Sequence, residues 1–437
     1  MQNEVWAADT AFMDSLCGEY RRHNQIDPAD YERYQVKRGL RNPDGTGVMA
    51  GVTQIGSVMG YYVQDGERVP APGKLIYRGI DVEALIDGFV GEGRFGFEET
   101  AYLLLMGSLP TRAQLEGFQA LLNHHHALPP MFTEDMIIKA PSPDVMNKLA
   151  RSVLALYSYD DNPDDLSLAN QLRQAVGLIA RVPTIVAHAF AVKRHYYDNE
   201  SLYLHRPQEG LSVAENFLYS VRHDNQYTAE EARLLDLCLV LHAEHGGGNN
   251  STFTTSSGTD TYSAIAAAVG SLKGPRHGGA NKKVMEMFGG LEADVKDWAN
   301  DDAVRDYLAR LLRKEAGDRS GLIYGIGHAI YTLSDPRAVV LKRFARKLAE
   351  SKGMLEEFEL FERVERLAPE VLLSVKGEEK VVCANVDFYS GLVYKMMGIP
   401  MELYTPLFAV ARMVGWCAHR IEEVYQPGNR IIRPAYK

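Results

Sequence analysis

The sequence is poor in cysteine and has no long uninterrupted apolar segment. Its 437 residues contain four widely spaced cysteines and no Cys-x-x-Cys pair: Cys17, Cys238, Cys383 and Cys417. So few cysteines cannot form a disulfide framework, which favours a reducing compartment. The most apolar stretch, 175–192, contains Arg181 and Pro183, so no segment reaches the roughly 20 uninterrupted apolar residues of a membrane-spanning helix.

Basic residues are also in the minority. The 47 Lys and Arg residues against 57 Asp and Glu residues give a formal net charge of −10. This charge argues against a general nucleic-acid binder, because such a protein needs positive charge against phosphate. Residues 1–14 lack the basic start and apolar core of a signal peptide and the Arg-rich character of a transit peptide. We therefore expect a cytoplasmic protein that binds neither nucleic acid nor a membrane.

What is present is an ordinary globular composition with a helical period. Apolar residues make up 46% and charged residues 24% of the chain, and the length predicts two or three domains at about 150 residues each. Three capping boxes, at 111–114, 212–215 and 228–231, predict helix starts. Sparse strand signals at 48–64 and 74–77 predict short hairpins near the N-terminus. The prediction is a mainly α fold.

Four polar segments stand in apolar surroundings, and the first is residues 241–250, Leu-His-Ala-Glu-His-Gly-Gly-Gly-Asn-Asn. One interpretation is a helix C-terminus, where His complements the negative end of the dipole and Gly caps the helix. A zincin-type metal site fits less well. Its histidines are four apart with Glu directly after the first, whereas His242 and His245 are three apart with Glu244 before the second. We predict no metal site.

The second polar segment is residues 274–281, Gly-Pro-Arg-His-Gly-Gly-Ala-Asn, between an Ala-rich helix at 264–269 and a helix that begins near Asn281. Its glycines and proline fix a tight turn and let backbone approach a ligand closely. The positive end of the helix dipole would keep His277 neutral, so that it donates a hydrogen bond without being a strong acid. The alternative is a polar turn with a satisfied histidine.

The third polar segment is residues 325–331, Gly-Ile-Gly-His-Ala-Ile-Tyr, followed by Ser-Asp-Pro-Arg at 334–337. It lacks the third glycine and the preceding strand of a dinucleotide-binding fingerprint. We interpret it as a flexible loop whose backbone groups are open to a ligand. Asp335 and Pro336 also predict a helix start, with Asp335 as the cap.

The fourth polar segment is residues 384–391, Ala-Asn-Val-Asp-Phe-Tyr-Ser-Gly. Val and Phe flank Asp387, and such an apolar setting raises the pKa of a carboxyl group and makes it a better base. The alternative is that Asp387 is the N-cap of the next helix. Further on, Arg412 lies in an apolar helix, where an arginine usually has an anionic partner.

In this order and spacing the polar segments resemble the signatures of the citrate synthase family. The likeness rests on the segments that contain His245, His277, His328, Arg337 and Asp387, and on Phe-Ala-Val-Ala-Arg412 and Ile-Arg433-Pro. Weaker likenesses at 75–81, 99–111 and 215–218 extend the resemblance over roughly 73–434.

The resemblance implies a mostly helical homodimer in which each subunit has a large domain and a small domain that closes over the substrates. We expect the large domain to comprise residues 1–279 and 388–437, and the small domain residues 280–387. The small domain matches a charged helical block that runs to about Gly377. Arg433 would reach across from the partner subunit.

The resemblance also implies a reaction that joins acetyl-CoA to oxaloacetate and then hydrolyses the thioester to citrate and CoA. Asp387 would be the base that removes a methyl proton. His277 would donate a hydrogen bond to the thioester oxygen, because the developing enolate needs a donor. His328 would polarise and protonate the oxaloacetate carbonyl.

The substrates account for the remaining implied residues. Arg337 and Arg412, with Arg433, would clamp the oxaloacetate carboxylates, because a guanidinium matches a carboxylate in two-point geometry. His245 would hold the polar end of that substrate. No cofactor is expected, because the CoA thioester is itself a substrate. The last residues implied are those whose backbone would line the CoA adenine pocket, namely Ile323, Gly325, Ile326 and Gly327.

The chain departs from the family where CoA phosphates would bind. Tyr331 stands where many members carry a basic residue, and Lys342 or Lys380 is the candidate substitute.

Two alternative functions stay open. A 2-methylcitrate synthase uses propionyl-CoA with the same catalytic residues. One methylene group changes substrate discrimination by only about 1–3 kcal/mol, so the motif residues do not decide between the two enzymes. A non-catalytic CoA- or dicarboxylate-binding relative is favoured if one catalytic residue is missing, yet His277, His328 and Asp387 are all present.

Overall fold

Helices dominate the fold, which confirms the prediction of a mainly α protein. The computed structural model describes residues 10–42, 44–275, 277–377 and 381–436. Its contacts separate two units: the described residues up to Ala50 together with those from Arg433 onward, and the residues Gly51–Ile432. The first unit contains three short helical elements: α2 (Thr10–His23), α3 (Pro28–Arg33) and the 3₁₀ turn η1 (Arg38–Leu40).

The second unit contains the strands and the remaining helices. The strands are β1 (Gly56–Gln64), β2 (Glu67–Tyr77) and β3 (Ile80–Asp81). The helices before residue 275 are α4 (Val82–Gly91), α5 (Phe97–Met106), α6 (Arg112–His125), η2 (Thr133–Ile138), α7 (Val145–Ala155), η3 (Leu156–Tyr159), α8 (Leu168–Tyr197), α9 (Val213–Val221), α10 (Ala229–His242), α11 (Asn250–Thr255) and α12 (Thr261–Lys273). Those after it are α13 (Ala280–Asp294), α14 (Asp301–Leu312), α15 (Pro336–Lys352), α16 (Leu355–Lys376), α17 (Val386–Met396), η4 (Met401–Leu403) and α18 (Tyr404–Tyr425).

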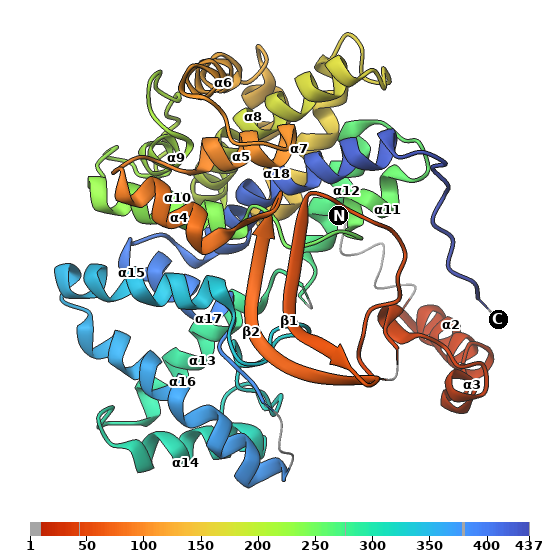
Figure 1. The fold of residues 1–437 in the computed structure, drawn as a ribbon, viewed down its shortest axis with the longest axis vertical. Coiled ribbons are helices and arrows are strands. Elements are labelled where there is room, and N and C mark those ends of the chain that lie inside the picture. The colour runs from red at the N-terminus through yellow and green to blue at the C-terminus, as the bar shows by residue number, and fades with distance from the viewer. Residues whose placement is uncertain (1–9, 43, 276, 378–380, 437) are drawn as a thin grey trace. The chain divides into compact units, whose positions relative to one another are not determined.

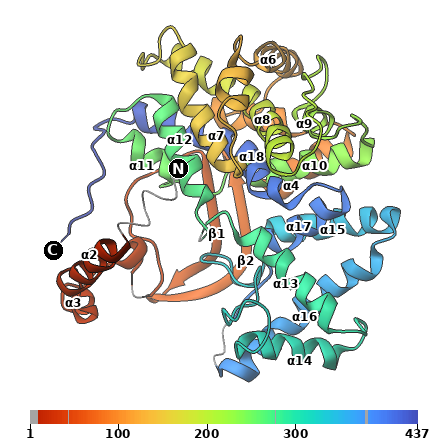
Figure 2. The ribbon, with the colours of Figure 1, turned by 180° about the vertical axis from the view of Figure 1, so that it is seen from behind.

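The helices of the second unit form two groups, with β1 and β2 running beside both (Figures 1 and 2). Helices α13–α17 lie together and pack on one another, and α5–α12 pack with α18. The two groups are connected where α10 packs against α15 and where α13 packs against α18. Their association is hydrophobic, because apolar side chains of both groups belong to one buried cluster. The domain boundaries expected at residues 279/280 and 387/388 remain a prediction.

Helix starts follow the sequence signals closely. Thr111, Ser212 and Thr228 each accept a hydrogen bond from the backbone amide three residues on. The side chain of the Gln or Glu at that position accepts one from the amide of the cap residue, so all three capping boxes are confirmed. Asp335 caps α15 with Pro336 at the first helical position, also as predicted. Asp387 is not a cap: Asn385 caps α17 and accepts from the Asp387 amide. That alternative interpretation of Asp387 is therefore wrong.

The most apolar stretch of the sequence lies inside α8, which continues through Arg181 and Pro183. By length and composition this helix could cross a membrane, but 89% of its most apolar window is buried inside the protein. It packs against α6, α7, α9 and α18. Its apolar character is therefore explained by a central position among other helices.

The strand region is one long hairpin rather than the short hairpins expected at 48–64 and 74–77. β1 pairs antiparallel with β2 from Gly56↔Tyr77 to Gln64↔Glu67. Its two-residue turn, Asp65-Gly66, has positive φ at both positions (52° and 84°), as a type I′ turn requires. Sequence reasoning missed the first half of β2 because it contains Pro70 and Pro72, and proline removes a ladder donor. Proline is tolerated there because β3 pairs with β2 only at Ile76 and Tyr77.

The hairpin holds the loop that precedes α15. Thr332 Oγ1 donates a hydrogen bond to the Gly60 carbonyl at 2.6 Å, and the Gly73 amide donates to Ser334 Oγ at 3.1 Å. A Cβ atom on Gly73 would collide with the backbone carbonyl oxygen of Ser334 and lie 2.7 Å from Tyr331 Cδ1. Glycine at this position therefore lets hairpin and loop approach backbone to backbone.

We expect Gly73→Ala to lower the free energy of unfolding by about 1–3 kcal/mol, because the added methyl group overpacks a closed contact. Denaturant unfolding monitored by circular dichroism measures the effect. Gly88→Ala in α4 is the matched control, since no atom lies within 4 Å of its Cβ position. Removing a helix-interior glycine should stabilise the control by about 0.5–1 kcal/mol. A Gly73→Ala protein as stable as the control would contradict the close approach.

Candidate active site

Two loops distant in sequence are joined where the third and fourth polar segments meet. The Asn385 amide donates to the Gly325 carbonyl at 2.8 Å, and the Gly327 amide donates to the Cys383 carbonyl at 2.7 Å. Asn385 Nδ2 adds a bond to the Gly327 carbonyl at 2.9 Å. Asn385 thus caps α17 and also ties that helix start to the loop that carries His328.

Helix α18 ties the first and second polar segments to the same region. Arg412 Nε donates to the His242 carbonyl at 2.7 Å, and the Gly415 amide donates to the Ala243 carbonyl at 3.2 Å. Nearer the start of α18, Thr405 Oγ1 donates to the Gly278 carbonyl at 2.8 Å, one residue after His277. One apolar helix therefore holds both histidine turns.

His328 is held as a neutral donor. Its Nδ1 accepts hydrogen bonds from the backbone amides of Ile330 at 3.1 Å and Tyr331 at 3.2 Å. Because an accepting ring nitrogen carries no proton, the proton of the neutral ring lies on Nε2. The fold thus selects the tautomer that presents Nε2–H as a hydrogen-bond donor.

His245 packs against His328 and Tyr331. Its ring centroid lies 5.3 Å from that of His328 and 5.6 Å from that of Tyr331. Burial lowers the pKa of His245 well below its usual value, and the charges of Arg337 and Arg412 lower it further. His245 Nε2 and the Tyr331 hydroxyl are both buried without a hydrogen-bond partner among the described residues. Such groups are costly to leave unpaired, so they indicate a polar ligand.

Two buried arginines face this site in different states. Arg337 is paired: Nε and Nη2 donate to the two carboxylate oxygens of Asp335 at 3.0 and 2.8 Å. Burial alone would lower the pKa of Arg337, but the Asp335 charge raises it above its usual value. Arg412 instead donates to a carbonyl, and its Nη2 is buried without a partner among the described residues. The expectation that Arg412 has an anionic partner is therefore not met within the described chain.

Asp387 lies in the first turn of α17, close to both arginines electrostatically. Burial raises its pKa from about 3.8 to about 6, while the charges of Arg337 and Arg412 act in the opposite direction. Desolvation therefore outweighs the nearby positive charge. A carboxylate with a pKa near 6 is ionised at neutral pH and is a stronger base than an exposed one, which fits a proton acceptor.

His277 lies on the turn before α13, where its amide donates to the Gly274 carbonyl at 2.9 Å. The residue is exposed, yet partial desolvation and then the charge of Arg412 lower the pKa of its ring. This is the direction expected for a neutral donor. The contacts and charge interactions thus connect His277 with His245, His328, Arg337, Arg412 and Asp387 around α18.

The loop expected to contact CoA is less open than predicted. The amide of Ile326 donates to the Ile323 carbonyl, and the Gly327 amide and the Gly325 carbonyl are also paired. Gly325 has φ of +81°, and a Cβ there would lie 2.8 Å from Phe388 Cδ2. The expectation of open backbone groups is wrong for these atoms, because the loop is closed by its partner segment.

The three remaining predicted residues have different outcomes. Lys342 pairs with Glu365 at 2.7 Å and with Glu362 at 3.4 Å, and Lys380 lies outside the described residues. Arg433 belongs to the first unit, so its role remains a prediction.

Sequence reasoning missed several residues of the site. Asp335 was identified as a helix cap but not as the partner of Arg337, and Tyr331 was noted only as a departure from a family pattern. Glu244 was compared only with a zincin glutamate, whereas its Oε1 accepts from His419 Nε2 at 2.8 Å. These pairings join residues far apart in the chain or depend on side-chain direction, and no local signal reports them.

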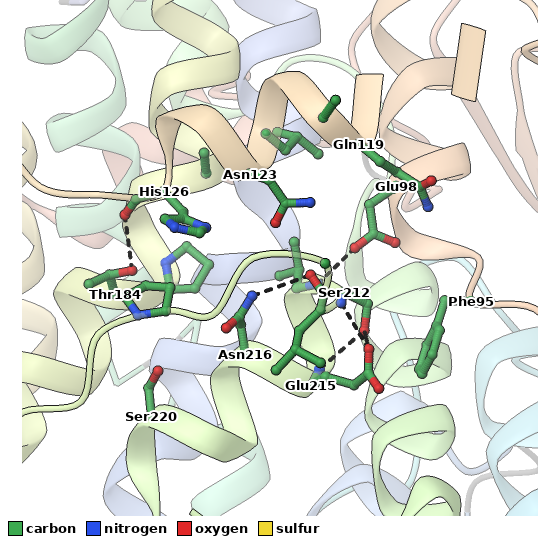
Figure 3. A pocket seen from close by; sticks show the side chains of 18 of the residues that line it. Phe95, Glu98, Gln119, Asn123, His126, Thr184, Ser212, Glu215, Asn216 and Ser220 are labelled. Atoms are coloured by element: carbon green, nitrogen blue, oxygen red, sulfur yellow. Dashed lines mark hydrogen bonds between the residues drawn. The ribbon is translucent and has the colours of Figure 1, made fainter. Parts of the chain in front are cut away.

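The described residues contain no group of three or more His, Cys, Asp or Glu side chains arranged to hold a metal ion. A separate cavity of about 610 Å³ lies among α5, α6, α8 and α9 (Figure 3). Glu98 faces this cavity and accepts from the Val213 amide at 2.7 Å, beside the Ser212–Glu215 capping box. None of the site residues predicted from the sequence is among its described lining residues.

Comparison with known proteins identifies the same family throughout. The family profile described as "Citrate synthase, C-terminal domain" matches residues 43–435. A citrate synthase from Synechocystis sp. is 36% identical over 371 residues, which cover 83% of this chain and 84% of that protein. A 2-methylcitrate synthase from Shewanella oneidensis is 33% identical over 83% of this chain and 87% of its own length.

Solved structures agree. The ternary complex of carboxymethyl coenzyme A and oxaloacetate with citrate synthase from Thermoplasma acidophilum superposes with a TM-score of 0.73. It is 27% identical in sequence, and the match covers 92% of this chain and 95% of that one. The resemblance found in the polar segments is confirmed.

The raised pKa of Asp387 predicts a stability cost at neutral pH. The ionised carboxylate is disfavoured in the folded protein, so the cost is full above the folded pKa of about 6 and disappears as the pH falls below the unfolded pKa. We expect Asp387→Asn to raise the free energy of unfolding at pH 7.5 by about 2–3 kcal/mol, and this gain should vanish below about pH 3.5. Asp306→Asn, at an exposed carboxylate of α14, should change stability by less than about 0.5 kcal/mol. If the Asp387→Asn variant is no more stable than wild type at pH 7.5, the carboxylate is not desolvated in this way.

Proposed function

We propose, because this chain belongs to the citrate synthase family, that it condenses acetyl-CoA with oxaloacetate and hydrolyses the resulting citryl-CoA thioester to citrate and CoA. One observation carries the proposal. A carboxyl group with a pKa of about 6 lies near two buried nitrogens, Arg412 Nη2 and His245 Nε2, that have no partner among the residues the structure describes. A dianionic keto acid supplies the acceptors that these donors lack.

The first step removes a proton from the methyl group of acetyl-CoA. Asp387 takes this proton, and its desolvation makes it a better base. Negative charge then develops on the thioester oxygen, where His277 donates a hydrogen bond as a neutral imidazole. The lowered pKa of His277 supports this neutral state, and donors aimed at a developing oxyanion contribute strongly to catalysis.

The second step forms the carbon–carbon bond. The enolate carbon attacks the ketone carbon of oxaloacetate, and His328 transfers its Nε2 proton to the alkoxide that forms. The two backbone bonds to Nδ1 support this role, because they leave the proton on Nε2. Water then cleaves the thioester of citryl-CoA and releases citrate and CoA. This water returns a proton to His328, and Asp387 gives the methyl proton to the departing CoA thiolate.

Oxaloacetate is held by guanidinium groups. Arg412 binds one carboxylate through Nη2, which has no partner in the described part of the chain. Arg337, oriented by Asp335, contributes to the second. His245 holds the polar end of the substrate. Arg433 of the partner subunit completes the clamp, in keeping with a homodimer. Bidentate geometry gives arginine the advantage over lysine here.

The domain arrangement follows from the same proposal. Residues 280–387 form a small domain that closes on a large domain of residues 1–279 and 388–437 once oxaloacetate is bound. Closure excludes water until condensation is complete, which prevents wasteful hydrolysis of acetyl-CoA. Ile323 and the loop 325–327 line the adenine pocket by packing contact, since the Ile326 and Gly327 amides are already paired within the chain. The enzyme is cytoplasmic and needs no cofactor beyond its CoA substrate.

A second candidate, 2-methylcitrate synthase, is favoured by the 33% identity to the Shewanella oneidensis protein of that name. It performs the same condensation with propionyl-CoA. A non-catalytic CoA- or dicarboxylate-binding relative is disfavoured because the residues proposed as base and donors are all present.

Free-thiol release tests the proposal directly. Mixing the protein with acetyl-CoA and oxaloacetate should release CoA thiol and form citrate, and neither substrate alone should do so. Asp387→Ala should retain oxaloacetate binding by calorimetry but lose at least about 100-fold in citrate formation, because it removes the base. Asp306→Ala at a distant exposed carboxylate is the control. Near-normal turnover by Asp387→Ala refutes the base assignment.

The acyl preference distinguishes the two candidate enzymes. We expect kcat/KM for acetyl-CoA to exceed that for propionyl-CoA by about tenfold or more, within the roughly 10–200-fold that one methylene group is worth. The same assay with both thioesters measures the ratio. A ratio below one assigns the chain to 2-methylcitrate synthesis, and release of no thiol from either compound favours the non-catalytic relative.

A further inference from the structure

A fully buried ion pair lies behind the substrate site. Glu244 is 0% exposed and His419 of α18 is 2% exposed. His419 Nε2 donates to Glu244 Oε1 at 2.8 Å, and the Gly246 amide donates to the same oxygen at 2.5 Å. Glu244 directly precedes His245, so this carboxylate fixes the turn that presents the His245 ring.

The remaining surroundings of Glu244 are closed. A Cβ on Gly56 would lie 2.9 Å from Glu244 Cγ, and a Cβ on Gly415 would collide with Glu244 Oε2. The Tyr77 hydroxyl donates to the Glu244 carbonyl at 3.1 Å. Neither β1 nor α18 leaves room beside Glu244 for a second side chain. Among the described residues, His419 is therefore the cation that lies within hydrogen-bond distance of the Glu244 carboxylate.

The charges around His419 favour its protonated form. Burial alone would lower the pKa of His419, but Glu244 and then Glu422 raise it to about 9. Glu422 Oε2 lies 3.7 Å from His419 Nδ1, and its other oxygen accepts from the Gln54 amide at 2.8 Å. Three other ionisable groups of the described residues interact with Glu244: Tyr77 at the end of β2, Arg78 directly after it, and Arg412 of α18.

The pair is important because Arg412 interacts electrostatically with Glu244, yet the structure shows no hydrogen bond between their side chains. The Glu244 charge raises the pKa of Arg412 against the lowering by burial, so the two groups interact. Nevertheless Arg412 Nη2 and Glu244 Oε2 both remain without a partner among the described residues. A buried carboxylate with no other cation would compete for that guanidinium.

We propose that His419 is a positioning residue that neutralises Glu244 and thereby keeps Arg412 and the His245 turn available for a dicarboxylate. The inference rests on the proposed function. His419 does not touch the substrate. When His419 loses its proton, the buried charge of Glu244 is no longer neutralised by His419. Glu244 then competes with the ligand for Arg412. Affinity for oxaloacetate is then expected to fall as the pH rises through about 9, and to be constant below about pH 8.

Calorimetric binding of oxaloacetate to the full chain tests this inference without turnover. We expect His419→Gln to weaken binding by about tenfold at pH 7.5 and to abolish the fall in affinity at alkaline pH. His188→Gln is the matched control. His188 is also buried and hydrogen-bonded, to Thr133 Oγ1 and the His205 carbonyl, but lies on α8 away from the site. This control should lower the melting temperature while leaving affinity and its pH dependence unchanged.

A compensating double variant separates positioning from simple structural support. Glu244→Gln removes the anion but keeps an oxygen that accepts from Gly246. In the double variant with His419→Gln, neither member of the pair is charged. The affinity for oxaloacetate at pH 7.5 should therefore return to within about threefold of wild type. The double variant should also fold if His419→Gln alone does not, because replacing both members of a buried pair costs less than removing one.

The outcomes are distinguishable. A wild-type protein that binds no oxaloacetate contradicts the proposed function itself. If wild type binds but His419→Gln binds equally well with the same alkaline fall, or if the double variant stays as weak as the single one, the role assigned to His419 is wrong. Restoration of affinity in the double variant, without the alkaline fall, supports it.

Discussion

The bond network of one buried carboxylate, Asp335, underlies the geometry of the site. It caps α15 by accepting from the Arg337 amide, holds the Arg337 guanidinium through both oxygens, and accepts from the Val386 amide at 3.1 Å. The Val386 bond fixes the start of α17, which carries Asp387. A desolvated pair is stabilising only when its remaining hydrogen bonds are satisfied, and here they are satisfied by two helix starts. The orientations of an arginine and of the proposed base therefore depend on the same group.

The hairpin and α18 extend this arrangement outward. Gly60 and Gly73 let β1 and β2 contact the loop 330–336 through backbone, and that loop fixes His328 by two amide bonds to Nδ1. On the other side, α18 holds the turns that carry His245 and His277 through bonds to main-chain carbonyls. Backbone groups thus hold the ring of His328 and the turns that carry His245 and His277.

The sequence was sufficient for features that are local or that recur in a family. Capping boxes depend on residues three apart, and all three formed. The polar segments identified a family that the comparisons confirm. What the sequence could not supply depends on contacts between distant segments. The first half of β2 was missed because its prolines are acceptable only beside an unpaired edge. The third segment was expected to be an open loop, but Asn385 closes it from 58 residues away.

The groups left unsatisfied by the fold are those expected to meet the ligand. Native structures rarely bury polar atoms without partners. Arg412 Nη2, His245 Nε2 and the Tyr331 hydroxyl nevertheless have none within the described part of the chain, and Asp387 is desolvated in the same region. Each costs stability in the free protein. A ligand with two carboxylates and a keto oxygen would satisfy the donors together, so binding free energy would include the release of these costs. His419 has the complementary role: it pairs with Glu244, a nearby anion that would otherwise compete for Arg412 before any substrate binds.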